Sequence, residues 1–362
     1  SRAVEPCTAA CPRKSRTEAL GRLAPQRQRR YPVAMIGHDV LRAALSHPLD
    51  ATNREALGLP ASAAFYEGKV RDNYSLGDGR RVLVTTDRIS AFDRVLGTLP
   101  LKGQVLNRMS HHWFEETRAI APNHVLAMPD PNLLIGLECR PLPVEMVVRS
   151  YLTGVTSTSV WTHYARGERF FAGHALPEGL KKNEPLPEPI LTPSTKAAKG
   201  GHDVTASRAE ILAEGKLGEA EFDEAARLAM ALFRFGQERA RARGLILVDT
   251  KYEFGVDSKG TIRVIDEIHT PDSSRYWFAA SYEARLAKGE EPESFDKEYV
   301  RRWLASVGFT GDGPIPPIPE EVRIEAASRY VAAYEAIVGA PFEPELSEPL
   351  PRMKAALATA LG

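Results

Sequence analysis

The segment LILVDTKYEFG, residues 245–255, constrains the fold more than any other part of the chain. Its apolar and β-branched residues predict a strand, in which successive side chains point to opposite faces of a sheet. One face would carry the charged residues Asp249, Lys251 and Glu253. The other would carry Val248, Thr250, Tyr252 and Phe254. One face of the sheet can therefore join a core while charged side chains gather on the other.

A second strand is expected at Thr261–Ile268, so the two strands form a hairpin. If the turn has two central residues, Lys251 lies opposite Asp266. Glu253 then lies diagonally from Asp266, at roughly 7 to 8 Å between backbones. Two such carboxylates can hold Mg²⁺, which takes one or two protein carboxylates and completes its shell with phosphate oxygens and water. The alternative is an exposed salt-bridge ladder, worth at most about 1 kcal/mol.

Three segments predict an N-terminal, sheet-based lobe over residues 35–150. A β-hairpin is expected over Phe65–Asp87, with its turn at Gly77–Gly79. A helix is expected over Lys102–Arg118, and a strand over Arg140–Leu152, where apolar residues alternate.

The second lobe, residues 151–362, is expected to be α+β with helices at its C-terminal end. Gly218–Arg243 predicts a helix because acidic residues fill its first turns and arginines its last, which complements the helix dipole. Further helices are expected at Phe295–Val307, Glu320–Val338 and Pro351–Leu361. The segment Leu176–His202 is rich in Pro, Gly and Lys, and predicts a long loop that could act as a lid.

Residues 1–34 are Arg-rich, contain several prolines and lack an apolar period, so a disordered extension is expected. Met35 begins the stretch MIGHDVLRAAL, which has the character of a natural start. A transit peptide is the alternative, although acidic residues in the segment argue against it.

The composition excludes several classes of protein. The 362 residues include 47 basic and 47 acidic side chains, so net charge gives no reason to expect a nucleic-acid or membrane-surface partner. Cys7, Cys11 and Cys139 form neither a disulfide framework nor a zinc motif, which suits reduced thiols in the cytoplasm. No apolar run approaches the roughly 18 residues of a membrane-spanning helix.

Three further motifs could bind phosphate or other anions. In Tyr66–Asp72, a glycine would let the backbone approach a phosphate beside two cations, although a surface strand explains the same residues. Thr85–Asp93 gathers hydroxyls, carboxylates and an arginine at a strand end, where capping is the alternative. Thr192–Lys196 and Lys199–Asp203 could close over phosphate or form a plain surface loop. No Ser/His/Asp or Cys/His nucleophile arrangement can be argued.

These motifs occur together in one known family. GKVRD, DRISAFD, VEMVVRSYLTG, TPSTK with HD, VDTKYEFG and IDEIHTPDSSRYW follow each other in the order found in SAICAR synthetases. The chain resembles that family over Phe65–Phe278. The resemblance implies a two-lobed α+β fold, with an antiparallel β-rich N-terminal lobe, a larger α+β lobe and ATP between them.

The resemblance also implies a reaction and roles for individual residues. CAIR, a phosphoribosyl-aminoimidazole carboxylate, would be joined to L-aspartate with ATP and Mg²⁺, giving SAICAR, ADP and phosphate in de novo purine biosynthesis. Contacts with ATP are implied for Gly68, Lys69, Val70, Arg71, Glu145, Met146 and Lys196. Contacts with the substrates are implied for Asp87, Arg88, Ser90, Asp93, Arg149, Thr156, His202, Asp203 and Arg275. Mg²⁺ would be held by Glu253 and Asp266, with Lys251 and Asp249 as catalytic residues.

The chain departs from the family pattern after Arg149. Ser150 and Val155 stand where the family has Gly and a substrate-contacting Ser, so Thr156 or Ser157 would supply the hydroxyl.

A carboxylate is a poor electrophile, so amide formation needs activation. Phosphoryl transfer from ATP would give an acyl phosphate that the aspartate amine can attack, with catalysis resting on positioning and charge neutralisation. The alternatives are a small-molecule kinase and a non-catalytic nucleotide-binding protein. The sequence leaves the oligomeric state open.

Overall fold

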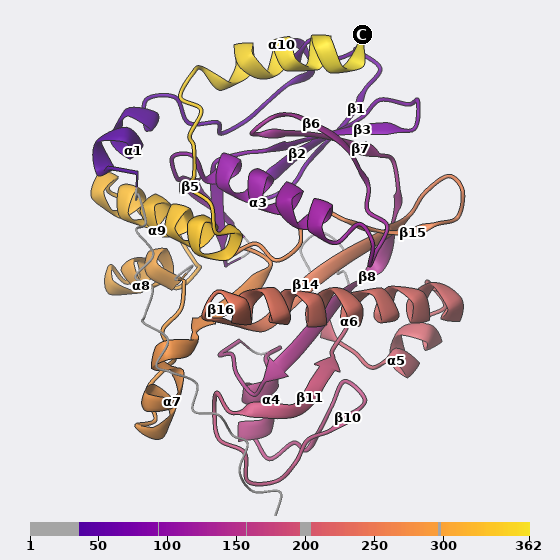
Figure 1. Ribbon diagram of the computed structural model, residues 1–362, viewed down its shortest axis with the longest axis vertical. Helices are drawn as coiled ribbons and strands as arrows, with labels where there is room; N and C mark the ends of the chain where they lie inside the picture. Colours follow the sequence, from indigo (N-terminus) through magenta and orange to yellow (C-terminus); the bar gives the residue numbers. More distant parts are fainter. Residues whose placement is uncertain (1–35, 93, 157, 196–203, 296–297) are drawn as a thin grey trace, which may run out of the picture. The chain divides into compact units, whose positions relative to one another are not determined.

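The computed structural model describes residues 36–92, 94–156, 158–195, 204–295 and 298–362 (Figure 1). The extension expected at residues 1–34 lies outside this part of the chain. Met35–Gly362 forms one compact unit. The division of that unit near residue 150 stays a prediction. No helix in the described residues is long and apolar enough to cross a membrane.

A five-stranded antiparallel sheet forms the N-terminal part of the fold (Figure 1). Its strands, in spatial order, are β1 (Ala64–Glu67), β2 (Arg71–Ser75), β3 (Arg80–Thr85), β7 (Leu133–Leu137) and β6 (Val125–Asp130). The C-terminal helix α10 (Pro349–Leu361) returns to this sheet, where Met353 and Leu357 pack with buried strand residues such as Tyr74 and Val82. The end of the chain therefore completes the core of its N-terminal sheet.

A seven-stranded antiparallel sheet forms the second part. Its central strands are β8 (Arg140–Tyr151) and β14 (Leu245–Val256), which are neighbours. The others are β11 (Pro185–Leu191), β12 (Ser194–Thr195), β13 (Val204–Thr205), β15 (Ile262–Ile265) and β16 (Ser274–Phe278). Two strand pairs stand apart, β4 (Arg88–Ala91) with β5 (Arg94–Thr98) and β9 (Phe170–Phe171) with β10 (His174–Ala175). Antiparallel sheets combined with helices confirm the predicted α+β fold.

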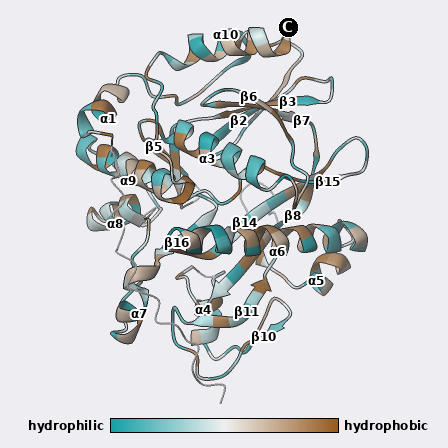
Figure 2. Cartoon of the chain, in the orientation of Figure 1, coloured by the Kyte–Doolittle hydropathy of each residue, from teal (hydrophilic) through white to brown (hydrophobic). Residues whose placement is uncertain are grey.

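Helices pack against both sheets, α6 (Glu219–Ala242) on β8 and β14 and α10 on β6. The remaining ones are α1 (His38–Ala44), α2 (Arg54–Leu57), α3 (Lys102–Glu116), α4 (Val160–Ala165), α5 (Arg208–Ala213), α7 (Ala279–Ala287), α8 (Glu298–Ser306) and α9 (Glu320–Val338). Helix α6 begins with Glu219 and Glu221 and ends with Arg239 and Arg241, as the sequence predicted. Hydrophilic and hydrophobic residues are interspersed along α6 in Figure 2, as expected of a helix that covers a sheet with one side.

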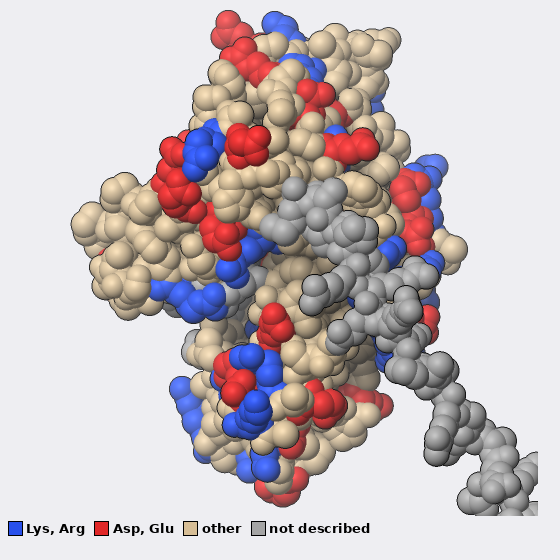
Figure 3. All heavy atoms as spheres, turned by 60° about the vertical axis from the view of Figure 1, so that its left-hand side comes forward, with Lys and Arg blue, Asp and Glu red and all other residues tan. Residues whose placement is uncertain are grey.

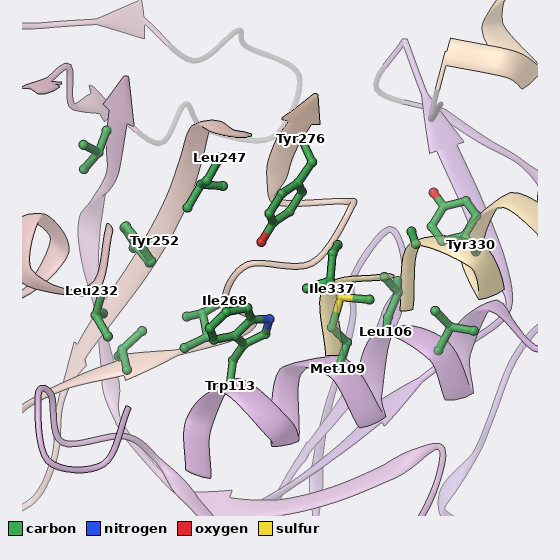
Figure 4. Packing of buried hydrophobic residues seen from close by; sticks show 14 of the residues in the cluster. Leu106, Met109, Trp113, Leu232, Leu247, Tyr252, Ile268, Tyr276, Tyr330 and Ile337 are labelled. Carbon is green, nitrogen blue, oxygen red and sulfur yellow. The ribbon is translucent and has the colours of Figure 1, made fainter. Parts of the chain in front are cut away.

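The largest core cluster joins α3, α6, α9 and the seven-stranded sheet. Trp113 and Met109 of α3 lie in this core with Tyr252 of β14 and Tyr276 of β16 (Figure 4). Tyr252 and Phe254 are both 0% exposed, so this part of the apolar face of β14 is buried as its alternation predicted. Helix α3 also contacts β3 and β6 of the five-stranded sheet, so it links the two sheets.

Residues 176–202 were expected to be a loop, and this prediction is wrong for part of the range. β11 and β12 both pair with β8. The prolines of PLPEPIL hid the strand, because proline lacks a ladder donor and is tolerated only at sheet edges or irregularities. The β11–β8 ladder is indeed irregular between Pro185 and Ile190.

Two buried histidines predict acid sensitivity. Burial is the main cause that lowers the pKa of His124 to about 3 from its usual 6.5, and burial also lowers that of His269 to about 3. Each histidine contributes stability above pH 6.5 that is lost as the pH falls toward 3. When the pH is lowered from 7 to 5, the free energy of unfolding of the wild type should fall by about 2 kcal/mol more than that of the His124→Gln variant. Urea unfolding at pH 7 and at pH 5 measures the free energy of unfolding of both proteins. A difference between wild type and variant that stays the same at both pH values would contradict this prediction.

Candidate active site

Lys251 lies at the centre of a charged cluster on the large sheet. The register of β8 and β14 pairs Glu253 with Glu145 across the strands. The Lys251 Nζ donates to Glu145 Oε1 at 3.1 Å and to Glu253 Oε1 at 2.5 Å. The predicted charged face of β14 is therefore a cluster in which one ammonium group is shared by two carboxylates.

The carboxylates of this cluster favour the protonated form of Lys251. Burial alone would lower its pKa, but Glu253, Glu145 and Asp266 outweigh burial and raise the pKa well above the usual value. Lys251 is therefore a permanent cation here and cannot act as a general base near neutral pH. It can neutralise negative charge on a ligand.

The hairpin after β14 differs by one residue from the predicted register. The Asp257 N–H donates to Thr261 O at 3.0 Å, and Val256 pairs with Ile262, which leaves residues 258–260 as the loop. Gly260 has a φ of 80°, the left-handed conformation that such a three-residue hairpin loop needs. Lys251 therefore does not lie opposite Asp266, and that prediction is wrong.

Asp266 nevertheless reaches the cluster. It follows the end of β15 and has a φ of 66°, so the chain turns there. Arg71 donates from Nη1 to Asp266 Oδ1 at 2.9 Å and from Nη2 to Glu267 Oε2 at 3.0 Å. Burial is the main cause that raises the pKa of Asp266 to about 6, and Glu253 raises it further. Arg71 thus ties the GKVRD turn to the acidic end of the hairpin.

The donor set fits Mg²⁺ only as a partial site. No group of three or more His, Cys, Asp or Glu side chains suited to a metal occurs among the described residues. Burial is the main cause of the raised pKa of Asp266, and Glu253 is close enough to raise it further. One or two carboxylates are what Mg²⁺ commonly takes from a protein when phosphates supply the remaining ligands. The residues therefore fit an ion that arrives with a nucleotide.

A second charged group lies farther along the same strands. Arg149 of β8 and Arg275 of β16 both pair with Asp249 in register. Their Nη1 atoms lie 3.6 and 3.5 Å from Asp249 Oδ2. Two guanidinium groups share one carboxylate, so the trio keeps a net positive charge that can attract an anion. The predicted residues Arg149, Arg275 and Asp249 are therefore brought together.

One detail of β14 was predicted wrongly. Val248 was placed on the face of Tyr252 and Phe254, but it packs in a separate cluster with Trp277 and Tyr282. The register between β14 and β16 shifts between Leu247 and Asp249, and this irregularity changes the alternation.

Arg88 shapes the turn between β1 and β2. Its bonds run to Gly68 O at 2.9 Å, Lys69 O at 3.1 Å and Asp72 Oδ1 at 2.7 Å, while Val70 O accepts from the Thr86 N–H at 3.0 Å. A Cβ at Gly68 would lie 2.9 Å from Arg71 O, so the turn needs glycine. Arg88 is only 3% exposed, and a direct substrate contact would require these bonds to be exchanged.

Asp87 has a similar internal role. Its Oδ1 accepts from the Gly103 N–H at the start of α3, and its Oδ2 accepts from the Leu49 N–H, both at 2.9 Å. Burial is the main cause that raises its pKa to about 6. The side chain caps a helix, and its expected contact with substrate stays a prediction.

A pocket of about 620 Å³ gathers further site residues. It is lined by Lys69, Ser90 and Thr156, and also by Arg301 and Arg302 of α8. The two arginines were missed from the sequence. Their only signal was an adjacent basic pair in an amphipathic helix, which usually marks a solvated face.

The remaining predicted residues are less informative. Met146 is 0% exposed within the core, so its side chain does not line a pocket. Asp93, Lys196, His202 and Asp203 lie outside the described residues, as does Ser157.

Comparison with known proteins decides the family. Residues 64–315 match the family model described as SAICAR synthetase. The chain belongs to the SAICAR synthetase family. It is 50% identical over 278 residues to the phosphoribosylaminoimidazole-succinocarboxamide synthase of Legionella pneumophila, strain Lens, which covers 76% of this chain and 88% of that protein.

Solved structures of SAICAR synthetases share the fold. The SAICAR synthase of Saccharomyces cerevisiae, solved with SAICAR, has a TM-score of 0.68 and 32% identity, covering 79% of this chain and 99% of that chain. A SAICAR synthetase structure in complex with ADP has a TM-score of 0.58 and 25% identity, covering 78% and 100%. The identification of a SAICAR synthetase from its motifs is confirmed, and with it an ATP-dependent ligase of purine biosynthesis.

Proposed function

We propose that this chain joins the carboxylate of CAIR to the amine of L-aspartate, with conversion of ATP to ADP and phosphate. The observation that carries the proposal is the arrangement around β14. Lys251 lies among the carboxylates of Glu145, Glu253 and Asp266. Asp249 lies on the same strand as Lys251 and is shared by Arg149 and Arg275 from the neighbouring strands. A phosphoryl-transfer reaction with anionic substrates needs such fixed charges.

The chemistry proceeds in two steps. A CAIR carboxylate oxygen attacks the γ-phosphorus of ATP and ADP leaves, which gives an acyl phosphate. The aspartate amine then attacks the acyl carbon, loses a proton, and phosphate departs as the amide forms. Lys251 neutralises charge on the phosphoryl group in the first step, while Arg149 and Arg275 orient an anionic substrate.

Glu253 and Asp266 are the residues that would hold Mg²⁺. When bound, the ion supplies positive charge to the phosphates of the nucleotide. The contact between Arg71 and Asp266 keeps that carboxylate in place beside Glu253.

The cytoplasmic location expected from the sequence stays a prediction. Acidic and basic side chains are interspersed on the face shown in Figure 3, which favours small-molecule partners over nucleic acid.

The pocket beside α8 leads to a testable prediction. Changing both Arg301 and Arg302 to Ala should raise KM about tenfold for CAIR or for L-aspartate, because both are anions and lose a charged contact. Steady-state kinetics with each substrate varied in turn measures this. Arg166→Ala, at the exposed end of α4, serves as the control. Unchanged KM values for both substrates would contradict the role of the arginines.

The decisive experiment follows ADP release by the purified protein with ATP, Mg²⁺ and CAIR, with and without L-aspartate. Aspartate-dependent ADP release matched by the mass of SAICAR is the expected result. Release without aspartate and without amide would indicate a small-molecule kinase. Nucleotide binding with no ADP release would indicate a non-catalytic protein.

A further inference from the structure

We infer that Thr192 is a positioning residue that fixes the guanidinium of Arg149. The inference rests on the proposed function, in which Arg149 binds an anionic substrate, and it takes that substrate to be CAIR. Thr192 lies between β11 and β12 and does not belong to the charged clusters described above. It would act through Arg149 rather than by touching a substrate.

The strand register places Thr192 beside Arg149. Leu191 pairs with Val148, and the Thr192 N–H donates to Val147 O at 2.7 Å. Thr192 therefore lies across from Val147 and diagonally from Arg149, two residues further along β8. Diagonal neighbours on one face of antiparallel strands are within reach of a long side chain.

The hydroxyl of Thr192 connects the two residues. Its Oγ1 accepts from Arg149 Nε at 2.8 Å and donates to Val147 O at 3.2 Å. Because a hydroxyl has one proton, donation to the carbonyl directs its lone pairs toward Nε. Thr192 is 0% exposed, so water does not readily replace this contact.

The result is a guanidinium held from two sides. Thr192 holds Nε, and Asp249 Oδ2 lies 3.6 Å from Nη1. Arginine recognises carboxylates and phosphates through a planar fork whose direction matters. Fixing the plane before the substrate arrives reduces the entropy lost on binding. Thr192 would thus affect the affinity for the anionic substrate more than the chemical step.

Two variants of similar size test the role of the hydroxyl. Thr192→Val should raise KM for CAIR about tenfold, with kcat and KM for ATP changed less than about threefold, because one hydrogen bond to a charged group is lost. Thr192→Ser keeps the hydroxyl and should remain within about twofold of the wild type. A thermal melt of each variant reports folding separately. An unchanged KM in Thr192→Val, or a Thr192→Ser variant as impaired as Thr192→Val, would overturn the inference.

Arg149→Lys provides a second test, which separates a role of Thr192 through Arg149 from a general structural defect. Lysine has no Nε of this kind, so adding Thr192→Val to Arg149→Lys should change KM for CAIR by less than about twofold. An additive effect of the two substitutions would mean that Thr192 acts elsewhere, and would overturn the inference. A wild type that makes no SAICAR would instead refute the proposed function, since these comparisons need a working ligase.

Discussion

Replacing Glu253 with Gln should lower kcat for SAICAR formation about a thousandfold, on the order of 4 kcal/mol of transition-state stabilisation. Glu253 shares the ammonium of Lys251 with Glu145 and raises the pKa of Asp266. Its removal deprives Lys251 of one fixed partner and would take one carboxylate from the proposed Mg²⁺ site. Asp266→Asn should have an effect of the same order. ADP release at saturating substrates measures both.

The controls separate catalysis from folding. Gln preserves the shape of Glu253, so the thermal melting of the variant should stay close to that of the wild type. Glu188→Gln changes an exposed glutamate on β11 in the same way and should leave kcat unchanged. Near-normal activity in both Glu253→Gln and Asp266→Asn would refute their roles as metal ligands.

Replacing Lys102 with Met should destabilise the protein by about 3 to 5 kcal/mol, because it removes one partner of a buried ion pair. Lys102 is 0% exposed, and its Nζ lies 2.8 Å from Asp272 Oδ2. Tyr330 of α9 donates to the other oxygen of Asp272 at 2.6 Å. The carboxylate would remain buried with less compensation. Urea unfolding gives the free energy of unfolding directly.

A double variant tests the cause of this loss. Lys102→Met combined with Asp272→Asn removes both charges, so it should recover part of the stability lost by Lys102→Met alone. Lys216→Met removes an exposed lysine that pairs with Glu214, and should cost less than about 1 kcal/mol. A Lys102→Met variant as stable as the Lys216→Met variant would show that the buried pair contributes little.

The two predictions concern connected parts of the molecule. In the sequence, Asp272 lies between Glu267 and Arg275. Glu267 pairs with Arg71, and Arg275 lies beside Asp249. The loop that carries Asp272 thus joins the Lys251 cluster to the arginine pair. Its anchoring by α3 and α9 explains how helices distant from the motifs can support the site. The C-terminal helices α9 and α10 both contribute buried residues to the core clusters, among them Ile324 and Met353.

Local patterns were sufficient for much of the fold. The charge distribution along α6, the bounds Glu320–Val338 of α9 and the buried face of β14 at Tyr252 were all predicted, because each depends on residues close in sequence. The motifs also identified the family, since several short and specific segments occur in one order. The residues Lys251 and Glu253 were placed together by the two-residue period of a single strand.

The tertiary structure alone decided the register and the use of individual side chains. The strand register of the hairpin after β14 differs by one residue from the predicted register, because Gly260 permits a three-residue loop. Arg88 and Asp87 lie in a motif with substrate-binding character, yet their side chains bond to backbone groups brought near by folding. Arg301 lines a pocket with Lys69 and Ser90 because folding brings α8 near residues that are distant in sequence. Periodicity and charge pattern describe neighbours along the chain, whereas the partner of a side chain depends on long-range contacts that no local pattern encodes.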